Sequence, residues 1–159
     1  MTKILTSIFL GTLITIGSAA IAAGTAADPV VGTWKLNVAK STFKAGPALK
    51  SQTRIYSQSK QGILLNMKTV GADGKETTSQ ATYHLDGKEY PVTGSLDYDS
   101  LSGKQVDSNT AEFKLISAGK AVGTTRRTVS EDGKMLTVDF KITDAKGDKT
   151  QNLMVFDKQ

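Results

Sequence analysis

Apolar and polar residues alternate with a period of two along most of the chain. In residues 134–143, for example, Leu136, Val138 and Phe140 are apolar and the residues between them are polar. Successive side chains of a strand point to opposite faces, so this pattern indicates strands with one buried face. Few segments show the 3.6-residue period of an amphipathic helix, and we predict an all-β protein.

Turn-forming residues separate the alternating segments at short intervals. Asp-Gly pairs occur at 73–74, 86–87 and 132–133, and glycine suits the positive φ values of tight hairpins. These signals predict ten antiparallel strands, at about 31–38, 51–58, 62–70, 76–85, 88–93, 99–106, 110–117, 121–130, 134–143 and 149–157. The segment 39–50 contains Gly46-Pro47, so we expect one helical turn or a flap there rather than lid helices.

Ten short antiparallel strands leave two exposed sheet edges unless the sheet closes on itself. We therefore predict an up-and-down β-barrel, formed as a single domain by residues 28–159. A chain of this length buries enough surface to fold without disulfides or metal ions. The sequence has no cysteine, which excludes disulfides, thiolate metal ligands and a lipid-modified cysteine.

Residues 1–27 have the organisation of a secretory signal peptide. Lys3 provides a positive start, an apolar stretch follows, and small residues with sites resembling A-x-A end the segment, so cleavage is expected after Ala22 or Ala27. The uncharged stretch from Ile4 onward is also long enough for an uncleaved membrane anchor, but its second half is rich in Ala, Gly and Thr. We predict a periplasmic or secreted protein without stable membrane insertion after cleavage.

The charge of the predicted mature chain does not point to nucleic acid. Loss of Lys3 leaves 19 of the 20 basic residues against 15 acidic ones, a net charge of +4. The lysines are scattered rather than gathered on one stripe with aromatic residues between them. We expect no nucleic-acid partner, and the oligomeric state is left open.

Residue patterns typical of catalytic or metal sites are weak. His84 is the only histidine, and it alternates out of phase with Tyr83 and Leu85, so we expect it to face solvent. A lone histidine without cysteines does not make a zinc site, no serine lies in a nucleophile elbow, and no glycine loop would hold a phosphate. We predict a protein that is not an enzyme and has neither metal nor cofactor.

Short motifs at both ends of the predicted barrel carry a family resemblance. The opening Gly32-Thr33-Trp34 resembles the G-x-W strand of the calycins, which include lipocalins and fatty-acid-binding proteins. The last strand, 153–158, resembles that of fatty-acid-binding proteins, and the whole chain is similar to exported bacterial lipocalin-like proteins without an established activity. This resemblance implies a ligand-binding barrel whose floor is closed by Trp34.

The last strand departs from the fatty-acid-binding pattern. That family typically places an inward Arg-x-Tyr pair there, and the matching positions are Met154 and Phe156. Without this anchor for a carboxylate, we expect neutral ligands to bind nearly as well as acids, unless an inward Arg126 or Arg127 takes over as the anchor. Arg126 and Arg127 are consecutive, so one of them points inward and the phase is ambiguous, as it is for Arg54.

The leading functional hypothesis is binding of a small apolar or amphiphilic ligand inside the barrel. The candidate lumen residues are Trp34, Leu36, Leu65, Phe113, Arg126, Arg127, Phe140, Met154 and Phe156. The alternative is an envelope module with a filled barrel that binds a protein or polymer on its surface. An enzyme built on the same fold is a weaker third option.

Overall fold

A computed structural model describes residues 27–44, 47–143 and 146–159. The strands are β1 (Gly32–Leu36), β2 (Thr42–Phe43), β3 (Ser51–Ser59), β4 (Gly62–Val70), β5 (Glu76–Tyr83), β6 (Asp86–Thr93), β7 (Ser100–Gln105), β8 (Thr110–Ser117), β9 (Lys120–Val129), β10 (Met135–Thr143) and β11 (Lys149–Lys158). A single 3₁₀ turn, η1 (Val38–Lys40), follows β1. No helix among the described residues is long and apolar enough to cross a membrane.

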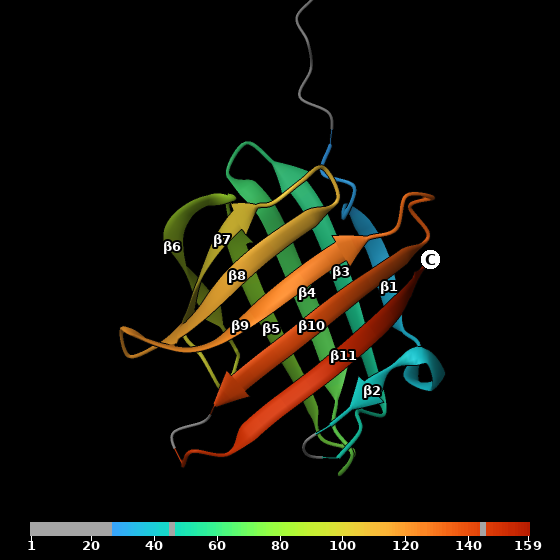
Figure 1. Ribbon diagram of the computed structural model, residues 1–159, viewed down its shortest axis with the longest axis vertical. Helices are drawn as coiled ribbons and strands as arrows, with labels where there is room; N and C mark the ends of the chain where they lie inside the picture. The colour runs from blue at the N-terminus through green and yellow to red at the C-terminus, as the bar shows by residue number, and fades with distance from the viewer. Residues whose placement is uncertain (1–26, 45–46, 144–145) are drawn as a thin grey trace, which may run out of the picture.

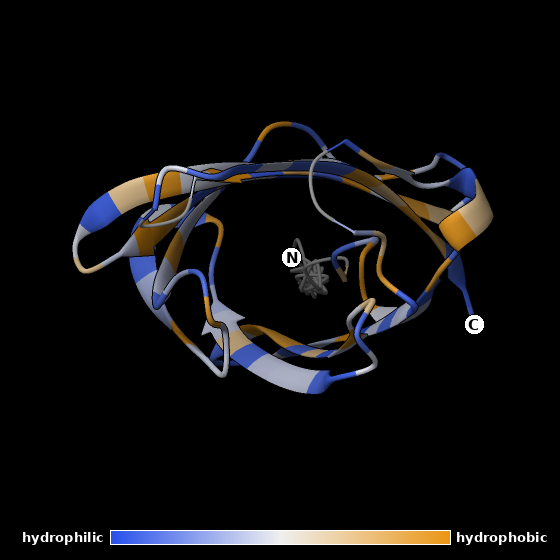
Figure 2. Ribbon diagram, turned by 90° about the horizontal axis from the view of Figure 1, so that it is seen from below, coloured by the Kyte–Doolittle hydropathy of each residue, from blue (hydrophilic) through white to orange (hydrophobic). Residues whose placement is uncertain are grey.

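Ten of the strands form a closed antiparallel barrel. The order is β1, then β3 to β11 in sequence, and β1 also pairs with β11 to close the ring. The short β2 lies outside the ring and pairs with β11. Figure 1 shows β7 to β11 as one wall in front of a second wall of β1, β3, β4 and β5, and Figure 2 shows the ring along its axis as a flattened oval.

Alternation along each strand separates the inside of the barrel from the outside. On β8, Phe113 and Leu115 are buried, whereas Glu112 and Lys114 are exposed. The ends of strands leave backbone N–H and C=O groups unpaired. Local hydrogen bonds in the hairpin turns satisfy these groups and so stabilise the turns. These observations confirm the predicted all-β barrel.

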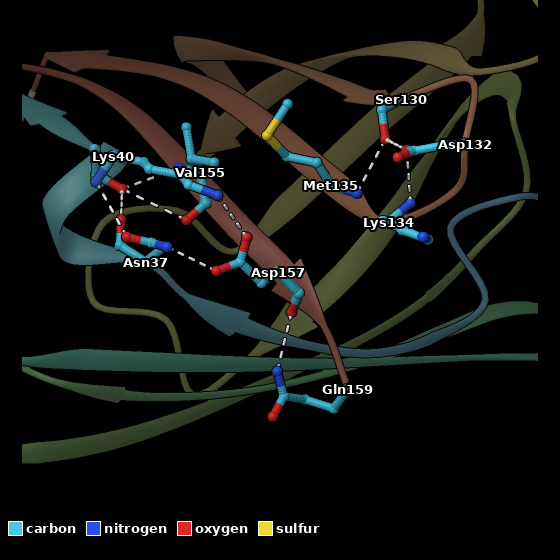
Figure 3. Close-up of polar contacts among 10 residues, drawn as sticks. Asn37, Lys40, Ser130, Asp132, Lys134, Met135, Val155, Asp157 and Gln159 are labelled. Atoms are coloured by element: carbon cyan, nitrogen blue, oxygen red, sulfur yellow. Dashed lines mark hydrogen bonds and ion pairs between the residues drawn. The ribbon is translucent and has the colours of Figure 1, made fainter.

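One hairpin turn, between β9 and β10, is drawn on the right of Figure 3. The Asp132 carboxylate accepts a hydrogen bond from the backbone N–H of Lys134 at 3.1 Å, and the Ser130 hydroxyl accepts one from the backbone N–H of Met135 at 2.9 Å. Gly133 adopts a φ of 67°, a left-handed conformation that glycine enters without strain. The turn therefore fixes the register of both strands.

Trp34 closes one end of the barrel, as the G-x-W motif predicts. Its side chain is fully buried, and the indole N–H donates a hydrogen bond to the backbone carbonyl of Val30 at 2.7 Å. Leu36, Leu136 and Phe156 are also buried in the same core cluster. This apolar floor leaves the remainder of the lumen open towards the opposite end of the barrel.

The predicted strands agree with the observed ones to within two residues at every boundary. The two-residue β2 was not predicted, because so short a segment has no measurable alternation. In the described part of 39–50, the chain forms the end of η1 and β2, and no helix covers the barrel there. The predicted signal peptide lies outside the described residues except for Ala27.

Candidate ligand-binding cavity

A cavity of about 330 Å³ lies inside the barrel. Protein sites for small molecules commonly start at about 300 Å³, so the volume suits a small ligand. Inward side chains from both walls line the cavity. Its outer end is formed by residues 94–98, between β6 and β7, where Leu96 is 89% exposed. The cavity therefore lies between the Trp34 floor and the loops at the other end of the barrel.

Much of the cavity wall is apolar. The apolar side chains that line it from the strands are Leu65, Met67, Leu101, Phe113, Leu115, Val138, Phe140 and Met154. They face inward because they share the buried phase of their strands, as Val138 and Met154 do where β10 and β11 pair. These residues offer dispersion contacts to the apolar part of a ligand.

Arg127 is one of two buried arginines that line the cavity. It lies on β9 with 3% of its surface exposed and forms an ion pair with Asp28, just before β1. Its guanidinium also donates to the Tyr83 hydroxyl at 3.1 Å and lies 5.6 Å from the centre of the Tyr56 ring. Burial lowers the pKa of Arg127, but Tyr83, Tyr56 and Asp28 together raise it above its ordinary value. The positive charge is thus neutralised within the protein.

Arg54, on β3, is the second buried arginine and has a different environment. It is 8% exposed, pairs in register with Trp34 of β1, and lies 4.9 Å from the centre of the Phe156 ring. Its Nε donates to Gln52 Oε1 at 2.8 Å, and its Nη1 donates to the Tyr56 hydroxyl at 3.5 Å. No ion pair is found for Arg54 in the described chain.

Two tyrosines that line the cavity keep their protons at neutral pH. Burial, the largest effect, raises the pKa of Tyr83 well above its ordinary value in spite of the nearby Arg127 cation. Burial likewise raises the pKa of Tyr98, against the opposing effect of Arg54. Both phenols are therefore neutral hydrogen-bonding groups.

A row of inward residues crosses the front wall of the barrel at one level. In register, Phe113 of β8 faces Thr125 of β9, which faces Phe140 of β10, which faces Asn152 of β11. Thr125 Oγ1 and Asn152 Oδ1 are buried without a hydrogen-bond partner in the described protein. Buried polar atoms without a hydrogen-bond partner are rare in proteins. These two atoms therefore distinguish this part of the wall from an ordinary packed core.

Most of the lumen residues predicted from sequence come together in this cavity. Leu65, Phe113, Arg127, Phe140 and Met154 line it. A second group of three predicted residues lies in the buried core at the floor, outside the cavity wall: Trp34, Leu36 and Phe156.

Arg126 does not face the lumen. It lies on the outer surface of the barrel, where it forms an ion pair with Glu112 and faces Asp139 in register. The neighbouring Arg127 takes the inward phase because it shares that phase with the buried Val129. The structure therefore decides between the two consecutive arginines.

The polar residues of β3 were not assigned to the site by sequence reasoning. Gln52, Arg54 and Tyr56 share one phase and all line the cavity. Ile55 points to the opposite face of β3 and is 43% exposed. Because it is apolar, the sequence did not show which face is buried, and the direction of Arg54 was ambiguous. The spacing of Arg54 and Tyr56 by two residues indicated that both side chains share one face of β3, but not that this face is the buried one.

The single histidine lies away from this cavity. His84 is exposed, as expected, and its ring centre is 5.9 Å from that of Tyr90. Within the part of the chain that the structure describes, no three His, Asp or Glu side chains gather as metal ligands.

No protein-family model, curated protein or solved structure matches this chain. The closed barrel that the calycin resemblance implies is present, whereas the family assignment itself stays a prediction from the sequence motifs.

Proposed function

We propose that this protein binds a small apolar or amphiphilic molecule inside its barrel and catalyses no reaction on it. The observation that carries the proposal is the internal cavity of about 330 Å³, with apolar walls and a few buried polar groups. Transfer of each CH₂ group from water to such a wall contributes about 0.8 kcal/mol. An apolar ligand body would therefore provide most of the affinity.

The polar groups of the cavity are suited to holding a ligand. General acid–base catalysis needs a group whose pKa lies near the working pH. Burial raises the pKa values of Tyr83 and Tyr98 instead, further from neutral pH. Such groups orient a ligand without exchanging protons with it.

Export is part of the proposal, because residues 1–27 resemble a signal peptide. Asp28, the residue after the expected cleavage site at Ala27, is built into the fold through its ion pair with Arg127. A mature chain that keeps Asp28 would thus retain this contact. We propose that the protein acts in the periplasm or outside the cell.

The alternative, a filled barrel that acts as a surface interaction module, predicts a close-packed interior. The cavity favours the ligand-binding function over this alternative. The same feature provides a direct way to test for binding in the lumen.

Native mass spectrometry of the exported protein, combined with binding of the neutral fluorophore N-phenyl-1-naphthylamine, tests the proposal. Ser79 lines the cavity from β5, so Ser79→Trp should fill the lumen and abolish binding. Thr78 is exposed on the same strand, and Thr78→Trp is the matched control that should bind like wild type. Equal binding by all three proteins, or no bound molecule and no fluorophore binding by wild type, would contradict a ligand site in the lumen.

A further inference from the structure

The described interior of the barrel carries more positive than negative charge. Arg54 and Arg127 are both buried, and the carboxylate of Asp28 pairs with Arg127. Asp97 lines the cavity but is exposed at its outer end, and no ion pair joins it to Arg54 in the described residues. A buried charge is strongly destabilised unless an opposite charge pairs with it. Arg54 is therefore a cation that lacks an anionic partner within the described protein.

Arg54 also has hydrogen-bond donors to spare. A guanidinium has five N–H groups in a planar fork. One Nε–H and one Nη1–H bond to Gln52 and Tyr56, which leaves three N–H groups without a partner in the described chain. Such a fork matches the two oxygens of a carboxylate and can bind both at once.

Neighbouring side chains can add further donors. Because the Tyr56 oxygen accepts the hydrogen bond from Arg54, its own O–H is free to donate. Gln52 Nε2 gives one N–H to Thr69 Oγ1 at 2.8 Å and keeps a second. The phenol of Tyr98 lies within electrostatic reach of Arg54 and Tyr56 and lines the same cavity. This group of residues presents donors and positive charge to one region of the lumen.

We propose that the ligand is an amphiphile with a single carboxylate, which Arg54 binds while the apolar body lies along the cavity wall. This inference rests on the proposed function and specifies its ligand class. Arg54 pairs in register with Trp34 on one side and Met67 on the other, so the carboxylate would lie near the floor. The apolar body would then extend past Met67 and Phe140 towards the outer end.

Arg54 lies on β3, whereas the carboxylate anchor typical of fatty-acid-binding proteins would lie on the last strand and is absent here. Met154 and Phe156 occupy that strand, and Phe156 instead supports the Arg54 guanidinium with its ring. The sequence led us to expect that neutral ligands bind nearly as well as acids. That expectation considered only Arg126 and Arg127 as possible inward cations. An inward Arg54 reverses that expectation in favour of acids.

Binding of three ligands with one apolar chain tests the proposal: decanoate, decanol and methyl decanoate, each measured at pH 7 by displacement of N-phenyl-1-naphthylamine. Wild type should bind decanoate about tenfold or more tightly than either neutral compound. Arg54→Met should lose this preference and still bind decanol. Arg126→Met is the matched control, because Arg126 lies outside the barrel, and should keep the full preference.

The outcomes separate the ligand class from the binding function. If decanoate and the neutral compounds bind wild type equally well and Ser79→Trp abolishes all binding, the lumen binds ligands but Arg54 is no carboxylate anchor. If none of the compounds binds, the proposed function itself fails. The comparison of acid with methyl ester in wild type stays decisive even if Arg54→Met does not fold.

Discussion

At the residue scale, the two arginines inside the barrel differ in the charge that faces them. Arg127 has Asp28 as an ion-pair partner and Tyr83 as a hydrogen-bond acceptor, so its contacts belong to the folded protein. Arg54 has the neutral side chains of Gln52 and Tyr56. Since a buried cation requires a counter-charge, the first arginine contributes to structure and the second is available to a ligand.

Loss of Asp28 should destabilise the fold, because Arg127 would be left buried and unpaired. Removing one partner of a buried ion pair typically costs about 3–5 kcal/mol. We expect Asp28→Asn to lower the free energy of unfolding by about 3 kcal/mol in urea titrations. Glu112→Gln, which breaks the exposed pair with Arg126, should cost less than about 1 kcal/mol. Equal losses for the two variants would contradict a buried role for the Asp28 pair.

Trp34 is the residue on which closure of the floor depends. It is fully buried and makes a hydrogen bond to Val30, so truncation leaves both a void and an unpaired carbonyl. We expect Trp34→Ala to lower the free energy of unfolding by about 3–5 kcal/mol, a typical cost for a large aromatic core residue. Leu96→Ala, at an exposed position, is the control and should leave stability nearly unchanged. A loss under about 1 kcal/mol for Trp34→Ala would contradict the closed floor.

The direction of single residues could be predicted from sequence where neighbours agree on the phase. Tyr83 and Leu85 correctly placed His84 outside. For the pair Arg126 and Arg127 the neighbours disagreed, because Val129 favours Arg127 inside whereas Val122 and Thr124 favour Arg126, so the sequence left that pair open. Arg54 could not be placed, because the exposed Ile55 is as apolar as a core residue. Strand alternation fixes relative phase, and only packing decides which phase is buried.

At the element scale, the closure between β1 and β11 is reinforced by the segment that follows β1. Asn37 Nδ2 donates to the Asp157 carboxylate at 2.6 Å, and Lys40 Nζ donates to its other oxygen at 3.2 Å (Figure 3). The Ser41 hydroxyl accepts a hydrogen bond from the backbone N–H of Val155 at 2.9 Å. The turn η1 and the short β2 thereby tie the first strand to the last.

This closure should depend on pH. Hydrogen bonds from Asn37 and then Lys40 hold the pKa of Asp157 below its ordinary value. A carboxyl with a lower pKa in the folded state stabilises the fold fully above its unfolded pKa of about 3.9, and the contribution is lost as pH falls through the folded value. We expect the stability difference between wild type and Asp157→Asn to be larger at pH 6 than at pH 2.5. A difference that is constant across this range, measured by urea unfolding, would contradict the role of the ionised carboxylate.

The elements that the sequence predicts best are those with long alternation and clear turns. Strands such as β1, with Trp34 and Leu36, and β10, with Leu136 and Val138, meet both conditions. β2 meets neither, since its two residues are held by hydrogen bonds to β11 that no local pattern encodes.

At the scale of the whole molecule, the closed barrel creates an interior that its side chains fill only in part. Period-two alternation predicts which residues share the interior, and five of the nine predicted lumen residues do line the cavity. Its volume and its charge balance could not be predicted, because both depend on how residues from opposite walls meet. Trp34, Leu36 and Phe156, for example, pack together at the floor and leave the space above them open.

Methyl NMR of the methionines can show whether a ligand occupies the lumen. The chain has four methionines, of which Met1 belongs to the predicted leader. Met67 and Met154 line the cavity, whereas Met135 is 38% exposed and does not line it. In exported protein with ¹³C-methyl methionine, decanoate should shift the Met67 and Met154 signals and leave Met135 unchanged. A shift of Met135 alone, or no shift at a decanoate concentration that displaces the fluorophore, would contradict binding in the lumen.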